Sequence, residues 1–484
     1  MKRTSLFYLI TLVVVGVSIA AILKVGHSLP QPQGSATVER AGTPAVDGVS
    51  PSAIDTVREG IVANFQHPLA HLFLQLLVII TVSRLMGKLF QRMGQPSVVG
   101  EMAAGILLGP SLLGLIAPGA FAFVFPASSL DALKLLSQIG VCLFMFAVGM
   151  ELDMRHVRSQ ARAAVMVSHA SIVFPCVLGV GLAYFLYSEY AAHGATFTSF
   201  ALFMGICMSI TAFPVLARIL QERGMTKTRL GGTAITCAAI GDVTAWNLLA
   251  FVVAIARSGS VAGTAINLLL VVLFMVLMIW VVRPGLPRWI GERRLASDEP
   301  SGGVLATILC VVVAASLFTE VIGIHALFGA FLAGAIMPDS HGFRHKIALR
   351  VEKFSSVLLL PLFFAYIGLR TQLGLLGDLS GWLICLLIIL VATVGKLGGS
   401  ALTARFTGMP WKESLQLGAL MNTRGLMELI ALNIGLDMGI LSPRIFTMLV
   451  IMALATTLLT GPLLTLFGNR SRAADGPPLP APSP

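Results

Sequence analysis

The stretch "LGGTAITCAAIGDVTAWNLLAFVVAIA", residues 230–256, contains a single charged side chain, that of Asp242. A run of this length and apolarity can cross the hydrocarbon core of a bilayer as one helix. A carboxylate inside such a helix costs about 3 kcal/mol or more. The stretch therefore predicts a transmembrane helix in which Asp242 either has a function or is the structural partner of a cation elsewhere in the bundle.

The composition extends this interpretation to the whole chain. Of the 484 residues, 56% are hydrophobic and only 11% are charged, and the mean hydropathy is +0.89. These values lie far from those of soluble proteins. Apolar runs of about 18 to 27 residues recur along the chain, which indicates helices, because a β-barrel has short alternating strands. We therefore expect an all-α polytopic membrane protein.

The formal net charge of +11 does not indicate a nucleic-acid partner. The basic residues stand in short clusters between apolar runs, as signals of membrane topology do, and they do not form one basic face. The six cysteines lie in apolar segments without the spacing of a metal site, so we interpret them as small packing residues. No resident cofactor is expected.

The sequence divides into four segments. Residues 1–24, "MKRTSLFYLITLVVVGVSIAAILK", have a basic start and an apolar core, so they are either a signal peptide or an anchor helix. Residues 25–68 are rich in Pro, Ser and Gly and predict an extramembrane linker. We expect a transmembrane domain over 69–467 and a short cytoplasmic tail over 468–484.

Thirteen spans are predicted in the transmembrane domain. Lys and Arg concentrate in every second loop, in clusters that begin at Arg84, Arg155, Arg218, Arg283 and Arg344. Basic loops stay in the cytoplasm, so the C-terminus is expected there too. The spans are 69–90, 96–117, 132–150, 161–187, 198–222, 229–256, 262–282, 303–320, 324–338, 354–373, 381–404, 413–436 and 444–467.

An internal repeat relates the two halves of this domain. "LFMFAVGMELDM" (143–154) aligns with "LFFAYIGLRTQL" (362–373), which places Gly149 on Gly368, and "AGILLGP" (104–110) resembles "AGAIMP" (333–338). Six-span units start near residues 69 and 303, and the single span 262–282 separates them. The second unit therefore starts on the opposite side of the membrane, and such inverted repeats are typical of secondary transporters.

Two spans carry signs of an interrupted helix. The fifth contains "SITAFPVLARIL" (209–220), in which Pro214 removes a backbone donor. The twelfth contains "MNTRGLMELIAL" (421–432), in which polar residues precede Gly425. Both occupy the same place in their repeat, and helices broken at mid-membrane form ion sites. The alternative is a proline kink in one span and a packing glycine in the other.

Few other ionisable residues are predicted to lie inside the membrane. Lys396 and Arg424 would neutralise buried carboxylates or negative helix ends. Arg424 and Glu428 are spaced i, i+4 and can pair on one helix face. Glu101, in the second span, is interpreted as a structural group, with an interfacial or gating role as the alternative. Three residues offer oxygens beside the freed backbone carbonyls of the broken helices, namely Thr211, Asn422 and Thr423.

These motifs together resemble a known family. "LLGPSLLG", "VGMELD", "SITAFPVLARIL", "GDVTAW", "LPLFFAYIGLRT", "VGK" and "MNTRGLMELIALNIG" follow one another between residues 69 and 467. The set is similar to the monovalent cation:proton antiporter-2 family, which has the sodium/hydrogen exchanger fold, and within it to plant-type cation/proton exchangers and their bacterial relatives.

The resemblance carries several expectations. It implies a homodimer, with Asp242 as the ligand of the transported alkali cation and the carrier of the proton. It places the basic residue of the eleventh span on Lys396, and the two crossing helices on 210–216 and 421–427. The sequence departs from the family at Gly241, where other members have an acid or an amide.

The expected function is antiport of Na+ or K+ against H+ in a bacterial inner membrane, without enzymatic activity. A proton and a dehydrated cation would compete for the oxygens of Asp242. Because Gly241 leaves one carboxylate in the motif, we expect electroneutral exchange. A gated potassium efflux channel and a sodium-coupled organic-anion symporter are the alternatives.

Overall fold

The computed structural model describes residue 64 and the ranges 67–151, 161–226, 228–258, 261–291, 301–322, 325–338 and 342–468. The segment predicted as a signal peptide or anchor helix (1–24) lies outside these residues. Nearly all of the predicted linker (25–68) and the tail beyond residue 468 also lie outside them. The described ranges cover the predicted transmembrane domain, 69–467, apart from the short gaps between them.

The described residues form helices, and the only β-type pairing among them is an isolated bridge between Ala191 and Leu441. Five-residue π-helical turns join α12 to α13 (Met278–Val282), α17 to α18 (Ser355–Leu359) and α19 to α20 (Val394–Gly398). The α-helices are α3 (Pro68–Arg92), α4 (Ser97–Leu108), α5 (Leu113–Ile116), α6 (Pro118–Val124), α7 (Leu130–Glu151), α8 (Ala161–Tyr190), α9 (Phe197–Cys207), α10 (Phe213–Glu222), α11 (Arg229–Ser258), α12 (Val261–Leu277), α13 (Arg283–Ile290), α15 (Gly302–Val321), α16 (Ala326–Ala335), α17 (Phe343–Phe354), α18 (Leu360–Arg370), α19 (Leu379–Thr393), α20 (Gly399–Phe406), α21 (Trp411–Met421), α22 (Leu426–Asp437) and α23 (Pro443–Phe467).

Ten helical segments of the described chain are long and apolar enough to cross a membrane. They correspond to ten of the thirteen predicted spans. The other three predicted spans, 198–222, 324–338 and 413–436, fall on short or interrupted helices, namely α9 with α10, α16, and α21 with α22. An all-helical membrane bundle is therefore confirmed, whereas helix length alone does not give the count of thirteen.

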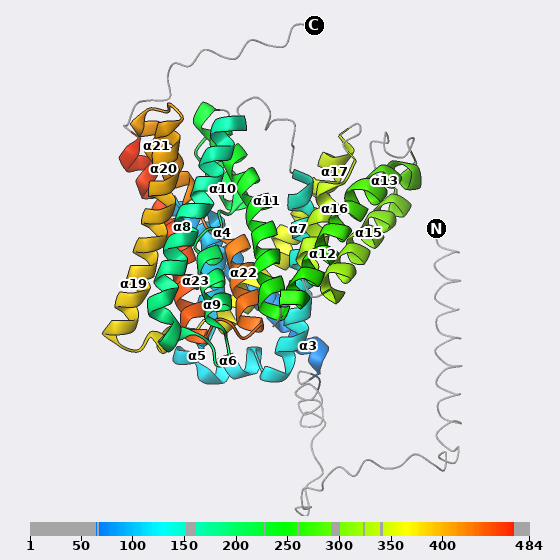
Figure 1. The fold of residues 1–484 in the computed structure, drawn as a ribbon. Helices are drawn as coiled ribbons and strands as arrows, with labels where there is room; N and C mark the ends of the chain where they lie inside the picture. Colours follow the sequence, from blue (N-terminus) through cyan, green and yellow to red (C-terminus); the bar gives the residue numbers. More distant parts are fainter. Residues whose placement is uncertain are drawn as a thin grey trace, which may run out of the picture. The chain divides into compact units, whose positions relative to one another are not determined.

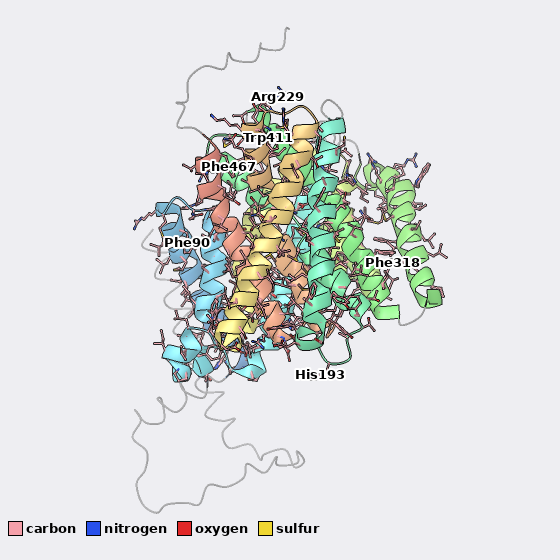
Figure 2. All side chains as sticks on the ribbon, turned by 60° about the vertical axis from the view of Figure 1, so that its left-hand side comes forward. Phe90, His193, Arg229, Phe318, Trp411 and Phe467 are labelled. Carbon is pink, nitrogen blue, oxygen red and sulfur yellow. The ribbon has the colours of Figure 1, made fainter. Side chains whose placement is uncertain are left out.

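Two ends of the bundle can be distinguished. Figure 2 shows Arg229, Trp411 and Phe467 together at one end and His193 at the other. We call the end with Arg229 and Trp411 the basic end, because Arg405 also lies there, with its guanidinium 5.8 Å from the ring centre of Trp411. At the opposite end, α8 and α22 terminate next to each other, and the short helices α5 and α6 lie there too (Figure 1).

Glycines allow four of the helices to approach closely in pairs. A Cβ at Gly368 on α18 would overlap the backbone of Gly105 on α4. A Cβ at Gly334 on α16 would overlap the carbonyl oxygen of Phe146 on α7, and one at Gly149 would overlap the backbone of α16. Small residues let membrane helices pack backbone to backbone in this way. The glycines of the motifs that predict an internal repeat therefore lie at these helix contacts.

Two helices are interrupted inside the bundle. The chain leaves helical geometry at 208–212, between α9 and α10, and at 422–425, between α21 and α22. The breaks touch, because the Ala212 N–H donates to the Thr423 carbonyl at 3.0 Å. Gly425 has a φ of 157°, which favours glycine. The predicted ranges, 210–216 and 421–427, overlap these breaks but run too far, because Pro214 opens the first turn of α10, where its missing N–H costs nothing.

Candidate functional site

Asp242 lies within α11 and is only 1% exposed. Neither of its carboxylate oxygens has a hydrogen-bond partner in the described part of the chain. The backbone N–H of Phe213, at the start of α10, is a weak donor to the carboxylate, and the ammonium of Lys396 acts on it electrostatically. A buried carboxylate without a well-formed hydrogen bond is costly, so its oxygens are available to a ligand that brings positive charge.

A small cavity of about 10 Å³ adjoins Asp242. That volume is close to one water-sized sphere. The cavity can therefore accept a single dehydrated ion or one water, but not an ion with its hydration shell. Its other walls are apolar and come from Ile210, Ala245, Trp246, Leu249 and Met427.

The three predicted oxygen ligands lie at the crossing of the two breaks, and each is at most 3% exposed. The Thr211 hydroxyl donates to the Met421 carbonyl at 3.1 Å. Thr423 Oγ1 lies 3.5 Å from Thr460 Oγ1. Both amide atoms of Asn422 lack a partner among the described residues. The structure thus brings Thr211 and Thr423 together and leaves the Asn422 side chain unpaired.

The buried cations Lys396 and Arg424 bind the C-terminal end of α9. Arg424 donates to the Cys207 carbonyl at 2.9 Å and to the Met208 carbonyl at 2.6 Å. Lys396 donates to the Ser209 carbonyl, and to that of Ser171 on α8 at 3.2 Å. The last carbonyls of a helix have no partners within it and carry its negative dipole end. These contacts correspond to one of the two predicted roles, the neutralisation of a helix end.

Arg424 also pairs with Glu428, as the i, i+4 spacing predicts. Their charged atoms are 3.5 Å apart, and both side chains are fully buried. Arg424 is further fixed through its backbone, because its N–H donates to Thr457 Oγ1 at 3.0 Å, and the Thr457 hydroxyl donates back to the Arg424 carbonyl at 2.8 Å. α22 is therefore anchored to both α9 and α23.

Glu101 is buried on α4 and does not belong to this cluster. The charged groups that act on it are Arg218 and Arg84, which belong to the basic end. Its sequence-based interpretation as a structural or interfacial group agrees with this position.

A cavity of about 610 Å³ leads from the basic end toward the crossing. Arg218 and Glu222 line it and are paired at 3.3 Å, and it reaches Pro214 and Leu426, at the starts of α10 and α22. The small cavity beside Asp242 shares no lining residue with this larger one. Sequence reasoning does not find this vestibule, although the i, i+4 spacing of Arg218 and Glu222 is a signal for the pair that lines it.

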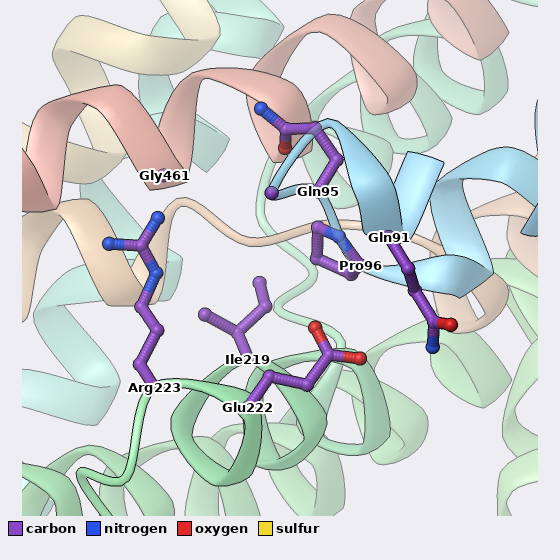
Figure 3. Close-up of a pocket in the computed structure, with 8 residues that line it drawn as sticks. Gln91, Gln95, Pro96, Ile219, Glu222, Arg223 and Gly461 are labelled. Carbon is purple, nitrogen blue, oxygen red and sulfur yellow. The ribbon is translucent and has the colours of Figure 1, made fainter. Parts of the chain in front are cut away.

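Another pocket at the basic end, of about 460 Å³, contains none of the predicted site residues. Figure 3 shows Glu222 and Arg223 extending into it from the end of α10, opposite Gln91 and Gln95. It has no intramembrane carboxylate and is separate from the ion site.

Gly241, next to Asp242 in the chain, packs against Ser168 of α8. A Cβ there would lie 3.3 Å from the hydroxyl of Ser168 on α8, and this buried hydroxyl has no partner in the described residues. A side chain at position 241 would therefore require Ser168 to shift. The sequence singles out Gly241 but carries no signal for Ser168.

A membrane bundle that holds a buried, unpaired carboxylate beside two crossing interrupted helices is the arrangement of a secondary transporter. The model of the family described as "Sodium/hydrogen exchanger, transmembrane" matches residues 77–470. The chain belongs to this family, which confirms the resemblance found in its motifs.

Individual relatives agree. The chain is 45% identical over 390 residues to the Na+/H+ antiporter NhaS4 of Synechocystis, covering 80% of this chain and 95% of the relative. It is 41% identical over 401 residues to cation/H+ antiporter 17 of Arabidopsis thaliana, covering 82% of this chain but only 48% of that longer protein. The solved structure of the sodium proton antiporter MjNhaP1 from Methanocaldococcus jannaschii has the same fold, with a TM-score of 0.60 at 16% identity, over 83% of this chain and 100% of that one.

Proposed function

We propose that this chain exchanges Na+ or K+ for H+ across a membrane, and that Asp242 binds both ions. The observation that carries the proposal is the buried carboxylate without a hydrogen-bond partner in the described residues, next to the crossing of two interrupted helices. The names of the relatives agree with it, since NhaS4 is a Na+/H+ antiporter and the plant protein a cation/H+ antiporter.

Coupling follows from competition for one group. The bare carboxylate of Asp242 is costly in this setting, and either a proton or a dehydrated cation neutralises it. Both use the same oxygens, so one excludes the other. Coupling requires that the site can switch its access from one side of the membrane to the other only when an ion or a proton occupies it. Each cation that leaves is then replaced by protons, so the cation flux and the proton flux are coupled.

Thr211, Asn422 and Thr423 complete the cation's shell in this proposal. A dehydrated ion at Asp242 needs protein oxygens in place of its water, and because the other walls of the small cavity are apolar, we assign those oxygens to the neighbouring crossing. The unpaired Asn422 amide supports this role. Carbonyl, hydroxyl and carboxylate oxygens suit both Na+ and K+.

Lys396, Arg424 and Glu428 balance charge and take no part in the exchange itself. The two cations are held by the carbonyls at the end of α9, and Glu428 is held by Arg424. With Gly241 beside it, Asp242 is the only carboxylate of its motif, so one proton moves for each monovalent cation and the exchange is electroneutral.

The architecture that we propose has thirteen spans, of which the first six and the last six are inverted repeats. The glycine contacts support this. The repeat alignment relates Gly149 to Gly368 and Gly105 to Gly334, and the contacts in the fold join Gly105 to Gly368 and Gly149 to Gly334. Exchanging the two repeats turns one contact into the other, as a two-fold axis requires.

The membrane setting follows from the charges. We place the basic end and the tail after residue 468 in the cytoplasm of a bacterial inner membrane, because basic loops stay inside. The cyanobacterial relative agrees with a bacterial setting. A homodimer is proposed from the family, with residues 69–467 as the exchanger domain.

The test is ion exchange in liposomes with Li+, Na+, K+ and Rb+, for the wild-type protein and for Asp242→Asn. The amide nearly keeps the shape but neither titrates nor carries charge. We expect saturable exchange by the wild type, no exchange above background by Asp242→Asn, and partial activity with altered affinity for Asp242→Glu.

Wild-type exchange by a folded Asp242→Asn protein would contradict the proposal. Flux that does not saturate and cannot be driven uphill by a pH gradient would indicate a channel instead. Competition by a small organic acid would indicate a symporter.

A further inference from the structure

Asp437, the last residue of α22, binds two cations at the end of the bundle opposite the basic end. Its carboxylate lies 2.5 Å from Arg370 Nη1 and 3.6 Å from Lys134 Nζ. Asn433, one turn earlier on α22, accepts from Arg370 Nη1 at 2.5 Å and donates to Asp437 at 3.4 Å. The three charged side chains are between 23% and 35% exposed, so these contacts are partly shielded from water.

The contacts join three helices, one of which begins at the crossing. Lys134 lies near the start of α7, and Arg370 is the last residue of α18. α22 begins at the crossing, directly after Gly425, and ends at Asp437. A single helix therefore connects the ion site with the cluster of Lys134, Arg370, Asn433 and Asp437.

The same three helices border the open vestibule at the basic end. α7 contributes Phe144, Ala147 and Val148 to its wall, α18 contributes Leu360 and Phe364, and α22 contributes Leu426. These helices thus leave a cavity of about 610 Å³ between them at one end, and charged side chains tie them together at the other.

Toward the tied end, apolar side chains adjoin Asp242. Trp246, Leu249 and Met427 line the small cavity beside it, and the Trp246 ring packs edge-on against Phe328, with 5.0 Å between the ring centres. Met427 belongs to α22, so a movement of α22 changes this wall of the cavity.

We propose that Asp437 is a positioning residue for exchange. Its bonds to Arg370 and Lys134 hold the end opposite the basic end closed while the basic end is open, and they must break before Asp242 becomes accessible from the other side. The inference rests on the proposed function, but it concerns access to the site and can be measured without transport.

The test uses two reporter cysteines in a variant whose six native cysteines are replaced by Ala. Ala245→Cys reports on the small cavity, and Val215→Cys reports on the vestibule. A membrane-impermeant thiol reagent is applied to proteoliposomes from each side, for wild-type Asp437, Asp437→Asn and Asp437→Glu.

We expect Asp437→Asn to speed labelling of Ala245→Cys from the side opposite the basic end and to slow labelling of Val215→Cys. Each change should be about fivefold, the equivalent of about 1 kcal/mol for a lost ion pair. Asp437→Glu keeps the charge and should restore much of the original pattern. Asp378→Asn is the matched control, because Asp378 also pairs with an arginine, Arg444, at 3.2 Å, but α19, which it caps, does not border the vestibule.

Unchanged labelling in folded Asp437→Asn would overturn the inference. Faster labelling of both reporters would also overturn it, because general loosening is what a purely structural role predicts. If Asp437→Asn does not fold, Arg370→Gln breaks the same contact from α18 and is judged by the same criteria. A failure of the Asp242→Asn transport test leaves these labelling results interpretable, so the two proposals fail separately.

Discussion

Arg424 is a fully buried guanidinium that binds the end of one interrupted helix from the other. We expect Arg424→Ala to lower the free energy of unfolding by roughly 3–5 kcal/mol, because it leaves the Glu428 carboxylate buried without its cation and two carbonyls of α9 without a donor. Arg424→Lys keeps the charge but cannot reach both carbonyls, so its loss should be smaller. Thermal unfolding of the purified protein in detergent measures both. Unfolding midpoints equal to that of the wild type would contradict the proposal that Arg424 stabilises the fold.

Asn422 lies at the crossing, and its side-chain amide has no hydrogen-bond partner among the described residues. The amide is therefore free to bind a ligand. We expect Asn422→Ala to raise the apparent KM for the cation about tenfold, with a smaller fall in the maximal rate, because a lost oxygen ligand weakens binding of the dehydrated ion. Asn247→Ala is the control, since Asn247 lies on the same helix as Asp242 but is exposed and bonded to the Val243 carbonyl. Liposome exchange over a cation series measures both constants, and equal KM values in the two variants would exclude Asn422 as a ligand.

The sequence identifies these residues but not their partners. Asp242, Lys396, Arg424 and Glu428 stand out because charge is rare in apolar spans. Whether Lys396 and Arg424 face carboxylates or helix ends depends on carbonyls of α9 that are about two hundred positions away in the chain. Spacing within one helix predicts only the local pair of Arg424 and Glu428.

At the scale of the helices, the contact of Gly105 with Gly368 fixes how α4 meets α18. We expect Gly368→Ala to cost roughly 1–3 kcal/mol or more of stability, because its Cβ would overlap the backbone of Gly105, which cannot move aside as a side chain can. Gly181→Ala on α8 has no atom within 4 Å of the new Cβ, so it should be neutral or slightly stabilising. Thermal stability measured side by side tests the contrast. Equal effects of the two substitutions would show that close approach is not what the glycine provides.

Helix boundaries mark the limit of what the sequence predicts at this scale. Pro214 and the polar group around Asn422 indicate which spans are broken, but the proline alone places the first break at Pro214 itself. In the fold Pro214 starts α10, and the break precedes it. The apolar run 324–338 predicts a span, but the helix that it forms, α16, is too short to be counted as a span by its length.

At the scale of the whole molecule, we propose that Gly241 sets the net charge moved in each exchange cycle. We expect the reversal point of exchange in liposomes to depend on the ion and pH gradients alone when the membrane potential is clamped. Lys396 donates to backbone carbonyls, so the prediction assigns the exchanged proton to Asp242 alone. A reversal point that moves with voltage would show net charge transfer. Gly241→Asp adds a second acid near Ser168 and is the variant in which voltage dependence should emerge.

The side chains of Lys396 and Arg424, bound to the end of α9, affect the stability of the fold when the ion site is empty. Their charge is covalently part of the chain and is present whether the pocket is full or empty. The transported ion, in contrast, binds and dissociates in every cycle. Because Lys396 and Arg424 already hold the interrupted helices together, the ion can dissociate without loss of the fold.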